Sequence, residues 1–314
     1  MKIVITEFMD ETAVALLRGS FDVCYQPTLV DLRADLLAGL ADIDALIVRN
    51  RTKVDVALLD AAPSLKVVGR LGVGLDNIDV DACAARGIGV IPATGANAGA
   101  VAEYVIGTAM ALLRQAYTRS GETAAGKWPR AALSNGRELS GKTLGLIGFG
   151  GIGQLTARLA QALGVTVIAY DPMFGVDAPV WAATGVSCRR FDDLLAEADI
   201  VSLHVPLVEQ TRDLMNAAAL ARMKQAAILI NTSRGGIVDE AALAQSLHDG
   251  HLGGAAIDVF TQEPLAAGTS LADAPNLILT PHIAGVTEES NTRVSAVIAT
   301  LVGNYLRQHQ PQPQ

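Results

Sequence analysis

The sequence predicts an α/β protein of two domains, each with a doubly wound parallel sheet. Short apolar runs alternate with helical patterns almost throughout the chain, as they do where helices connect parallel strands. The length of 314 residues favours about two domains. A glycine-rich phrase at residues 148–153 lies between a predicted strand and a predicted helix, which is the context of a nucleotide-binding turn.

The first sheet is expected over roughly residues 1–95. Glu11–Leu17 has the apolar spacing of a helix. The predicted strands are Lys2–Thr6, Ala45–Val48, Lys66–Gly69 and a strand that follows Arg86-Gly87 and is ended by Pro92.

A helix is predicted at Asn97–Leu113, and it is apolar on nearly all sides. Such a helix is buried, either between domains or against another subunit, so the pattern favours a homodimer. The following stretch, Ser120–Leu139, is predicted to be rich in loops. Its Trp128 is interpreted as a core or subunit-contact residue, or alternatively as a lid over a substrate pocket.

A second series of strands begins after this stretch, and a helix at Thr287–Arg307 returns to the first domain. We therefore expect a domain of residues 1–96 with 286–314 and a domain of residues 97–285. The predicted strands of the latter are Thr143–Ile147, Val165–Tyr170, Ile200–Leu203, Ala227–Asn231, Gly254–Asp258 and Leu277–Leu279.

Composition excludes several classes of partner. The net charge of -8 argues against nucleic acid, although local cations can still bind a small anionic substrate. The apolar start of the chain is too short for a signal peptide, and no apolar run is long enough for a membrane span. Cys24, Cys83 and Cys188 are interpreted as reduced, mostly buried thiols of a cytoplasmic protein, not as metal ligands.

The glycine phrase predicts a dinucleotide site. Gly148, Gly150 and Gly153 have the spacing that permits a tight turn, close approach of a pyrophosphate and packing of helix on strand. A helix is predicted at about Gln154–Leu163, and its N-terminus, together with Gly151 and Ile152 before it, would offer N–H groups and a partial positive charge to the phosphates.

Asp171 indicates which dinucleotide this site takes. It ends the second strand of the series, 18 residues after Gly153. A carboxylate there accepts hydrogen bonds from the adenosine ribose and repels a 2′-phosphate, so the sequence favours NAD over NADP. Arg189-Arg190 leaves NADP open, because these cations could lie near the adenosine end.

Several phrases occur together in an order typical of one family. They are Arg70-Leu71-Gly72-Val73-Gly74-Leu75-Asp76-Asn77-Ile78-Asp79, the glycine turn, His204-Val205-Pro206-Leu207, Asn231–Val238, Asp258-Val259-Phe260 and Pro281–Gly285. In these the chain resembles the D-isomer-specific 2-hydroxyacid dehydrogenases, especially the branch similar to 3-phosphoglycerate dehydrogenase. The resemblance implies two Rossmann-like domains, one flavodoxin-like and substrate-binding and one NAD-binding, with a cleft between them.

The resemblance also implies the catalytic residues. His282 would be the general acid/base for transfer of a proton to and from the substrate oxygen. Glu263 would hold the other ring nitrogen and favour the protonated ring. Arg234 would clamp the substrate carboxylate and polarise its carbonyl. Arg234 in a tight turn and Glu263 before a proline could instead be structural, and no metal is required.

Other positions are carried over from the family in the same way. Val73 and Gly74 would offer backbone N–H groups to the substrate carboxylate. Asp258 would face the nicotinamide carboxamide. The other positions that would line the cofactor site are Val205, Thr232, Ser233 and Gly285. His204 is interpreted as a structural residue.

Cations follow two strands of the first domain, and their role decides which substrate the sequence predicts. Arg49 and Arg51 follow one strand and Arg70 follows another. They either bind a second anionic group of the substrate or form a solvated basic loop, and the sequence gives the two alternatives equal weight. With a second anion, 3-phosphoglycerate or sulfolactate are candidate substrates, beside hydroxypyruvate and glyoxylate.

Two rival functions share these features. An NAD-sensing corepressor of the same fold would keep the same residues without being an enzyme. A formate dehydrogenase is a second rival, but in that branch a glutamine takes the place of Glu263. Turnover of 2-oxo acids with NADH would distinguish a dehydrogenase from both.

Overall fold

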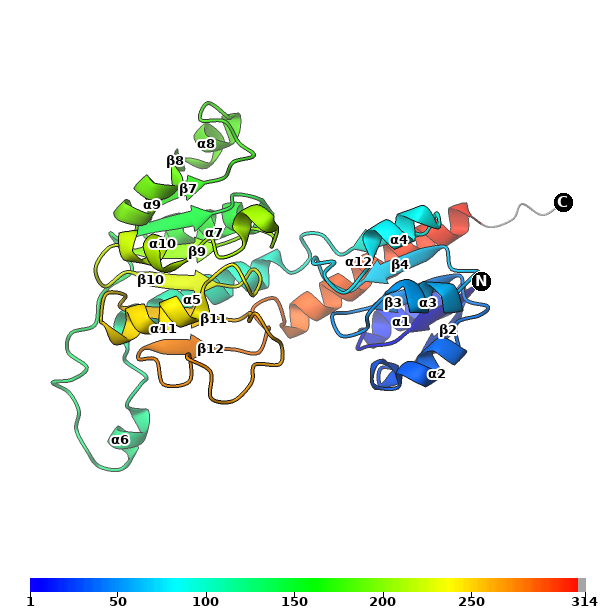
Figure 1. The fold of residues 1–314 in the computed structure, drawn as a ribbon, viewed down its shortest axis with the longest axis horizontal. Coiled ribbons are helices and arrows are strands. Elements are labelled where there is room, and N and C mark those ends of the chain that lie inside the picture. Colours follow the sequence, from blue (N-terminus) through cyan, green and yellow to red (C-terminus); the bar gives the residue numbers. More distant parts are fainter. Residues whose placement is uncertain (310–314) are drawn as a thin grey trace. The chain divides into compact units, whose positions relative to one another are not determined.

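The computed structural model describes residues 1–309, which divide into two compact units (Figure 1). Unit 1 is Met1–Asn97 together with the chain from Val286 onward, and unit 2 is Ala98–Gly285. Part of the predicted first domain, residues 310–314, lies outside the described residues. Within residues 1–309, no helix combines the length and the apolar character that crossing a membrane requires.

Unit 1 is built on a five-stranded parallel sheet of order β2-β1-β3-β4-β5. The strands are β1 (Lys2–Ile5), β2 (Asp22–Tyr25), β3 (Ala45–Val48), β4 (Val67–Arg70) and β5 (Gly89–Pro92). The helices are α1 (Glu11–Arg18), α2 (Arg33–Ala38), α3 (Val56–Ala61), α4 (Val80–Ala85) and α12 (Glu288–Gln308), with a 3₁₀ turn η1 (Leu29–Asp31). This strand order, in which the chain changes direction between β1 and β3, is the flavodoxin-like one.

Two features fix the geometry of this sheet. Parallel pairing places Ile3 opposite Ala45 and Ile5 opposite Ile47, so β1 and β3 end at the same edge. The long helix α12 packs on β4 at Gly69, where a Cβ atom would lie 2.7 Å from a methyl carbon of Val302. The final helix therefore belongs to the core of unit 1, as its predicted return requires.

Unit 2 is built on a seven-stranded parallel sheet of order β12-β11-β10-β9-β6-β7-β8. The strands are β6 (Thr143–Ile147), β7 (Thr166–Tyr170), β8 (Ser187–Cys188), β9 (Ile200–Leu203), β10 (Ile228–Asn231), β11 (Gly254–Ile257) and β12 (Leu277–Leu279). The helices are α5 (Ala98–Arg114), α6 (Ser120–Ala124), α7 (Gly151–Ala162), α8 (Pro179–Thr184), α9 (Phe191–Glu197), α10 (Ala217–Arg222) and α11 (Glu240–His248), with a 3₁₀ turn η2 (Glu209–Thr211). The order turns back between β6 and β9, as in dinucleotide-binding sheets.

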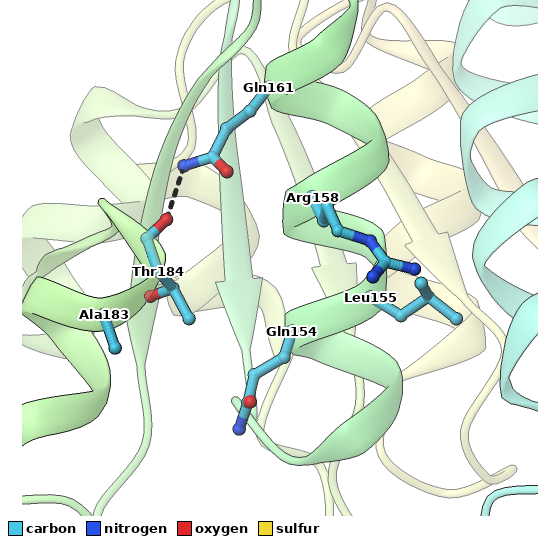
Figure 2. Close-up of a pocket in the computed structure, with 6 residues that line it drawn as sticks. All are labelled: Gln154, Leu155, Arg158, Gln161, Ala183 and Thr184. Carbon is cyan, nitrogen blue, oxygen red and sulfur yellow. Dashed lines mark hydrogen bonds between the residues drawn. The ribbon is translucent and has the colours of Figure 1, made fainter.

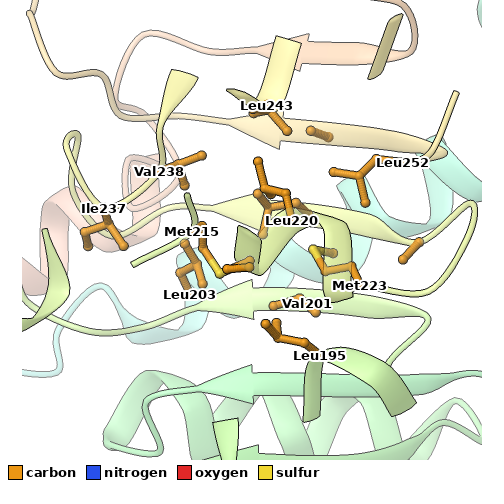
Figure 3. Close-up of a cluster of buried hydrophobic side chains, with 14 of the residues drawn as sticks. Leu195, Val201, Leu203, Met215, Leu220, Met223, Ile237, Val238, Leu243 and Leu252 are labelled. Carbon is orange, nitrogen blue, oxygen red and sulfur yellow. The ribbon is translucent and has the colours of Figure 1, made fainter. Parts of the chain in front are cut away.

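Helices cover both faces of the central strands of unit 2. Figure 3 shows the core cluster on one face, to which α9, α10 and α11 contribute Leu195, Leu220 and Leu243 and to which β9 contributes Val201 and Leu203. Strands β9 and β10 are buried along their whole length. Burial on both faces explains why these strands are continuous apolar runs in the sequence.

The predicted fold class is confirmed, and four strands have the predicted bounds: β3, β6, β9 and β12. The edge strand β2 was not predicted, because its alternating exposed and half-buried residues give no apolar run. One expectation was wrong: Cys24 lies exposed on β2, so it is not a buried thiol. Trp128 is 78% exposed, which excludes the core alternative and leaves the subunit contact and the lid as predictions.

Candidate active site

The predicted glycine turn joins β6 to α7 and packs where only glycine fits. Gly148 has φ +92, and a Cβ atom on it would lie 2.4 Å from the carbonyl oxygen of His204. A Cβ atom on Gly153 would lie 2.5 Å from the carbonyl oxygen of Gly148. The turn is therefore pressed against the end of β9, and Val205 lies beside it.

The start of α7 leaves room and hydrogen-bond donors for an anionic group. Nothing would lie within 4 Å of a Cβ atom on Gly150 or Gly151. Gly150 caps the helix without a side-chain hydrogen bond, so the N–H groups of Gly151 and Ile152 face outward at the positive end of the helix. These residues fit the pyrophosphate of NAD. The buried hydroxyl of Thr232 has no hydrogen-bond partner among residues 1–309, which fits a polar group of the same ligand.

Asp171 ties the end of β7 to the glycine turn. Its Oδ2 accepts the N–H of Phe149 at 2.7 Å and its Oδ1 accepts the N–H of Met173 at 2.9 Å. A carboxylate has about four acceptor positions, so both oxygens keep capacity for ribose hydroxyls. The cations that left NADP open have acidic partners of their own: Arg189 pairs with Glu197 and Arg190 with Asp193.

His282 and Glu263 form the predicted pair. The Nδ1 atom of His282 lies 2.8 Å from Oε2 of Glu263, and both side chains are about one-third exposed. The second oxygen, Oε1, accepts the N–H of Phe260 at 3.1 Å. The acid is thus held in place from its other side, and Nε2 is the ring nitrogen of His282 that faces away from this contact.

The turn that carries His282 is fixed by Asp258, which is 1% exposed. Its Oδ1 accepts the N–H of Ile283 at 2.8 Å and the hydroxyl of Thr280 at 2.6 Å, and its Oδ2 accepts the N–H of Ala284 at 2.8 Å. Tyr104 of α5 lies 2.6 Å from the same hydroxyl, and burial raises the pKa of its phenol. Asp258 therefore organises the turn that carries His282, and its position beside the nicotinamide stays a prediction.

This anchoring explains the unusual backbone of His282. Its φ of +56 lies in the left-handed region, which is uncommon for residues other than glycine, although asparagine, aspartate and histidine adopt it more often than most. The N–H of His282 donates to the carbonyl oxygen of Asp258 at 2.8 Å. The bonds that hold the turn on both sides compensate the strain and direct the imidazole toward Glu263.

Arg234 lies in a turn that follows β10. The Nδ2 group of Asn231 donates to the carbonyl oxygen of Arg234 at 3.0 Å, and Ser233 donates its hydroxyl to the carbonyl oxygen of Leu203. A Cβ atom on Gly235 would lie 1.8 Å from the carbonyl oxygen of Phe260. The turn with Arg234 therefore packs directly on the segment that leads to Glu263, so unit 2 brings the three predicted catalytic residues into adjoining segments.

His204 and Gly285 are the remaining predicted positions of unit 2. His204 is half-buried, with Nε2 at 3.0 Å from the hydroxyl of Ser202, and burial of the ring lowers its pKa to about 4. A ring that stays neutral supports the structural interpretation of this histidine. Gly285 is half-buried and is the last residue of unit 2.

In unit 1, the predicted substrate residues occupy the loops after β3 and β4. Arg49 is half-buried and donates to Oδ1 of Asn291 in α12 at 2.9 Å, while Arg51 forms an exposed ion pair with Asp31. Burial lowers the pKa of the Arg49 guanidinium. Arg70 donates to the carbonyl oxygen of Leu71 at 3.0 Å. Val73 is 37% exposed and Gly74 is half-buried.

Sequence reasoning missed the residues that hold these loops in place. Tyr104 and Thr280 have no motif of their own, since an apolar helix and a strand end contain them. Gly235 lies in the quoted phrase around Arg234, but its packing role depends on a segment 25 residues later. An acid just after a buried strand is the signal that could have found Glu7. Asn77 lies in the quoted phrase of residues 70–79, but its bonds to the loop after β3 depend on the fold.

A hollow of about 430 Å³ lies between α7 and α8 (Figure 2). It is lined by Gln154, Leu155, Arg158, Gln161, Ala183 and Thr184. Gln161 donates to the carbonyl oxygen of Thr184 at 2.9 Å across it. The lining shares no residue with the predicted site.

Among residues 1–309, no cluster of three or more metal-ligating side chains occurs.

Comparison with known proteins agrees with the dinucleotide site that the geometry of unit 2 indicates. Residues 106–284 match the family model described as D-isomer specific 2-hydroxyacid dehydrogenase, NAD binding domain. The chain is 56% identical over 293 residues to an (S)-sulfolactate dehydrogenase of Chromohalobacter salexigens, which covers 93% of this chain and 94% of that protein.

Two further similarities extend this result. The chain is 43% identical over 271 residues to a D-3-phosphoglycerate dehydrogenase of Mycobacterium leprae, with 86% of this chain and 50% of that protein covered. The chain thus spans about half the length of that relative. A solved structure of a protein from Thermus thermophilus superposes with a TM-score of 0.89 at 33% identity and covers 99% of both chains.

Replacing Asp171 should shift the preference between NADH and NADPH. Asp171→Ser removes the charge that repels a 2′-phosphate, so the ratio of the dissociation constants Kd(NADPH)/Kd(NADH) should fall by about tenfold, equivalent to about 1.4 kcal/mol. Fluorescence titration of the reduced cofactors measures this ratio. Asp177→Ser removes the same charge from an exposed position in the following loop and should leave the ratio unchanged; an equal shift in both variants would contradict the assignment.

Proposed function

The chain belongs to the D-isomer specific 2-hydroxyacid dehydrogenase family, and on that premise we propose that its substrate is a 2-hydroxy acid with a second anionic group. Family membership makes it an NAD-dependent oxidoreductase that interconverts 2-hydroxy acids and 2-oxo acids. The corepressor alternative is disfavoured, because the relatives are named as dehydrogenases. The observation that carries the chemistry is the contact of His282 with Glu263 in a turn anchored by Asp258.

We assign His282 as the general acid/base. Bound NADH supplies a hydride to C2 of the 2-oxo acid, and NAD accepts it in the reverse direction. As the carbonyl oxygen gains charge, Nε2 of His282 gives it a proton, and a hydroxyl forms. Glu263 accepts the hydrogen bond from Nδ1 and stabilises the charged ring before the transfer. The oxidative direction returns the proton to Nε2.

Arg234 is proposed to bind the carboxylate common to all such substrates. Its guanidinium can form two parallel hydrogen bonds with a carboxylate, and a second donor edge can polarise the adjacent carbonyl. The N–H groups of Val73 and Gly74 are proposed as a further carboxylate site. Residues 97–285 would then bind the cofactor, and residues 1–96 with 286–314 would bind the substrate.

The second anionic group is assigned to Arg49, Arg51 and Arg70. Arg49 is half-buried and charged, so an anion that reaches it gains more than it would at an exposed cation. The ion pair of Arg51 with Asp31 is exposed on both sides, and such a pair contributes about 0–1 kcal/mol, which a substrate anion can replace. Sulfolactate is the first candidate, since the relative with 56% identity is named for it, and 3-phosphoglycerate is the second.

A homodimer in the cytoplasm is the proposed state of the protein. Large apolar side chains are exposed at the end of α5 and in the segment after it: Met110 at 43%, Tyr117 at 76% and Trp128 at 78%. Grouping of such residues on one stretch of chain is typical of a subunit interface. The three cysteines are free thiols, which supports a reducing compartment.

Loss of the imidazole should abolish turnover without loss of cofactor. In His282→Asn the new residue tolerates the left-handed backbone, so the turn is preserved. We expect kcat to fall by a factor of about 10²–10⁴ and Kd for NADH to change by less than about twofold. Steady-state kinetics and fluorescence titration measure the two. His248→Asn, an exposed histidine of α11, is the control; parallel loss of NADH affinity in the site variant would indicate a structural histidine.

A screen of 2-hydroxy acids should favour those with a second anion. We expect kcat/KM for 3-sulfolactate or 3-phosphoglycerate to exceed that for glycerate, and Arg51→Ala to raise KM only for the former by about tenfold, or about 1.4 kcal/mol. Arg86→Ala removes a cation whose partner is Asp60 and serves as the control. An equal change of KM for all substrates would support the solvated-loop alternative instead.

Sedimentation velocity should show two chains per particle. Trp128→Glu places a charge among the exposed apolar residues and should shift the equilibrium to single chains, because a buried unpaired charge is unfavourable. Val176→Glu alters an apolar residue that is 77% exposed elsewhere in unit 2 and should leave the dimer intact. A single-chain particle in the wild type would contradict the dimer.

A further inference from the structure

A buried carboxylate lies beside the loop that carries two of the substrate cations. Glu7 follows β1 and is 5% exposed. Its Oε1 accepts the N–H of Arg49 at 2.8 Å and the N–H of Thr52 at 3.0 Å, and its Oε2 accepts the N–H of Arg51 at 3.1 Å. Three backbone donors of one loop thus converge on one side chain.

The same loop is held from its other side. Asn77 donates through Nδ2 to the carbonyl oxygens of Arg49 at 3.1 Å and Thr52 at 2.7 Å. Thr6 and Thr52 join their buried hydroxyls at 2.8 Å. Because both the donors and the acceptors of the loop backbone are bonded to side chains of neighbouring segments, the loop has one conformation.

The position of this arrangement in the sheet is significant. Strands β1 and β3 are neighbours, and the strand order turns back between them. In open α/β sheets, ligands bind at the carboxyl ends of the strands where this reversal occurs. In unit 2 the glycine turn and the start of α7 follow β6, one of the two strands at the reversal. In unit 1 both strands at the reversal take part, because Glu7 follows β1 and accepts the N–H groups of the loop after β3.

We propose that Glu7 is a positioning residue that fixes the directions of the Arg49 and Arg51 side chains toward the second anionic group of the substrate. Backbone N–H groups that converge on a fixed carboxylate set the dihedral angles of residues 49–52, and those angles determine where each guanidinium can reach. The inference rests on the proposed function, because it assumes that these arginines bind substrate.

Because Glu7 is charged, a positioning role and a purely electrostatic role predict opposite effects of its removal on KM. A negative charge near the arginines weakens attraction of an anion, so its removal alone would lower KM for a substrate with a second anion. Loss of positioning would raise KM. The sign of the change in KM therefore distinguishes the two effects.

Glu7→Gln is the direct test. An amide has one acceptor oxygen, so at least one of the three N–H groups loses its acceptor and faces an NH₂ group instead. We expect KM for 3-sulfolactate, or for 3-phosphoglycerate if that is the better substrate, to rise about tenfold. We expect kcat, KM for glycerate and Kd for NADH to change by less than about twofold. A lower or unchanged KM, or an equal rise for glycerate, overturns the proposal.

Two further variants keep the test decisive. Glu7→Asp retains the charge but shortens the side chain by one methylene, so positioning predicts a raised KM and electrostatics predicts none; it replaces the glutamine variant if that does not fold. Asp44→Asn is the matched control. Asp44 accepts the N–H of Lys2 and the ammonium of Lys66 at the opposite end of the same strands, so its loss should lower the melting temperature and leave KM unchanged.

Failure of the proposed function is recognised separately. If Arg49→Ala and Arg51→Ala leave the ratio of KM values for the two substrate types unchanged, the second-anion site is wrong and the role of Glu7 falls with it. If both arginine variants raise KM for the doubly anionic substrate and Glu7→Gln does not, the role of Glu7 alone is overturned. Isothermal titration with 3-sulfolactate measures the same ratios as dissociation constants.

Discussion

Carboxylates at strand ends accept the backbone N–H groups of neighbouring loops, and the described site depends on these bonds. Asp171 follows β7 and holds the glycine turn, Asp258 follows β11 and holds the turn of His282, and Glu7 follows β1 and holds the loop of Arg49. Parallel strands end at one edge, where their loops have no regular pairing. A side chain that carries several acceptor positions on one rigid group can connect two such loops at once.

Burial makes these connections specific. A carboxylate at 1% or 5% exposure, as for Asp258 and Glu7, is unfavourable unless its oxygens are hydrogen-bonded. The loops must therefore adopt the conformation that brings their N–H groups to the acid. At Asp258 this requirement extends to the left-handed backbone of His282, which would otherwise be unfavourable. The backbone conformation of His282 is thus determined by a residue outside the His282–Glu263 pair.

The sequence predicted the parts whose signal is local. Apolar runs located β3, β6, β9 and β12, because strands covered on both faces need no polar residue. The start of α7 was predicted at Gln154 but lies at Gly151, since glycines have low helix propensity and tertiary packing decides this end. The hydrogen bond of Tyr104 with Thr280 joins residues 176 positions apart and leaves no periodic pattern. The roles of Glu7 and Gly235 likewise depend on segments brought together only by the fold.

The two sheets use their points of reversal in different ways, and this difference has a chemical consequence. In unit 2, glycines at residues 148–153 keep side chains away from the N–H groups at the start of α7, so a phosphate from outside can be the acceptor. In unit 1, the donors belong to the loop after β3, the other strand at the point of reversal, and Glu7 satisfies them internally. Under the proposed function, a substrate anion would therefore reach the arginine side chains of that loop and not its backbone. Long side chains would suit a small substrate anion, whereas a backbone cradle suits a pyrophosphate of constant shape.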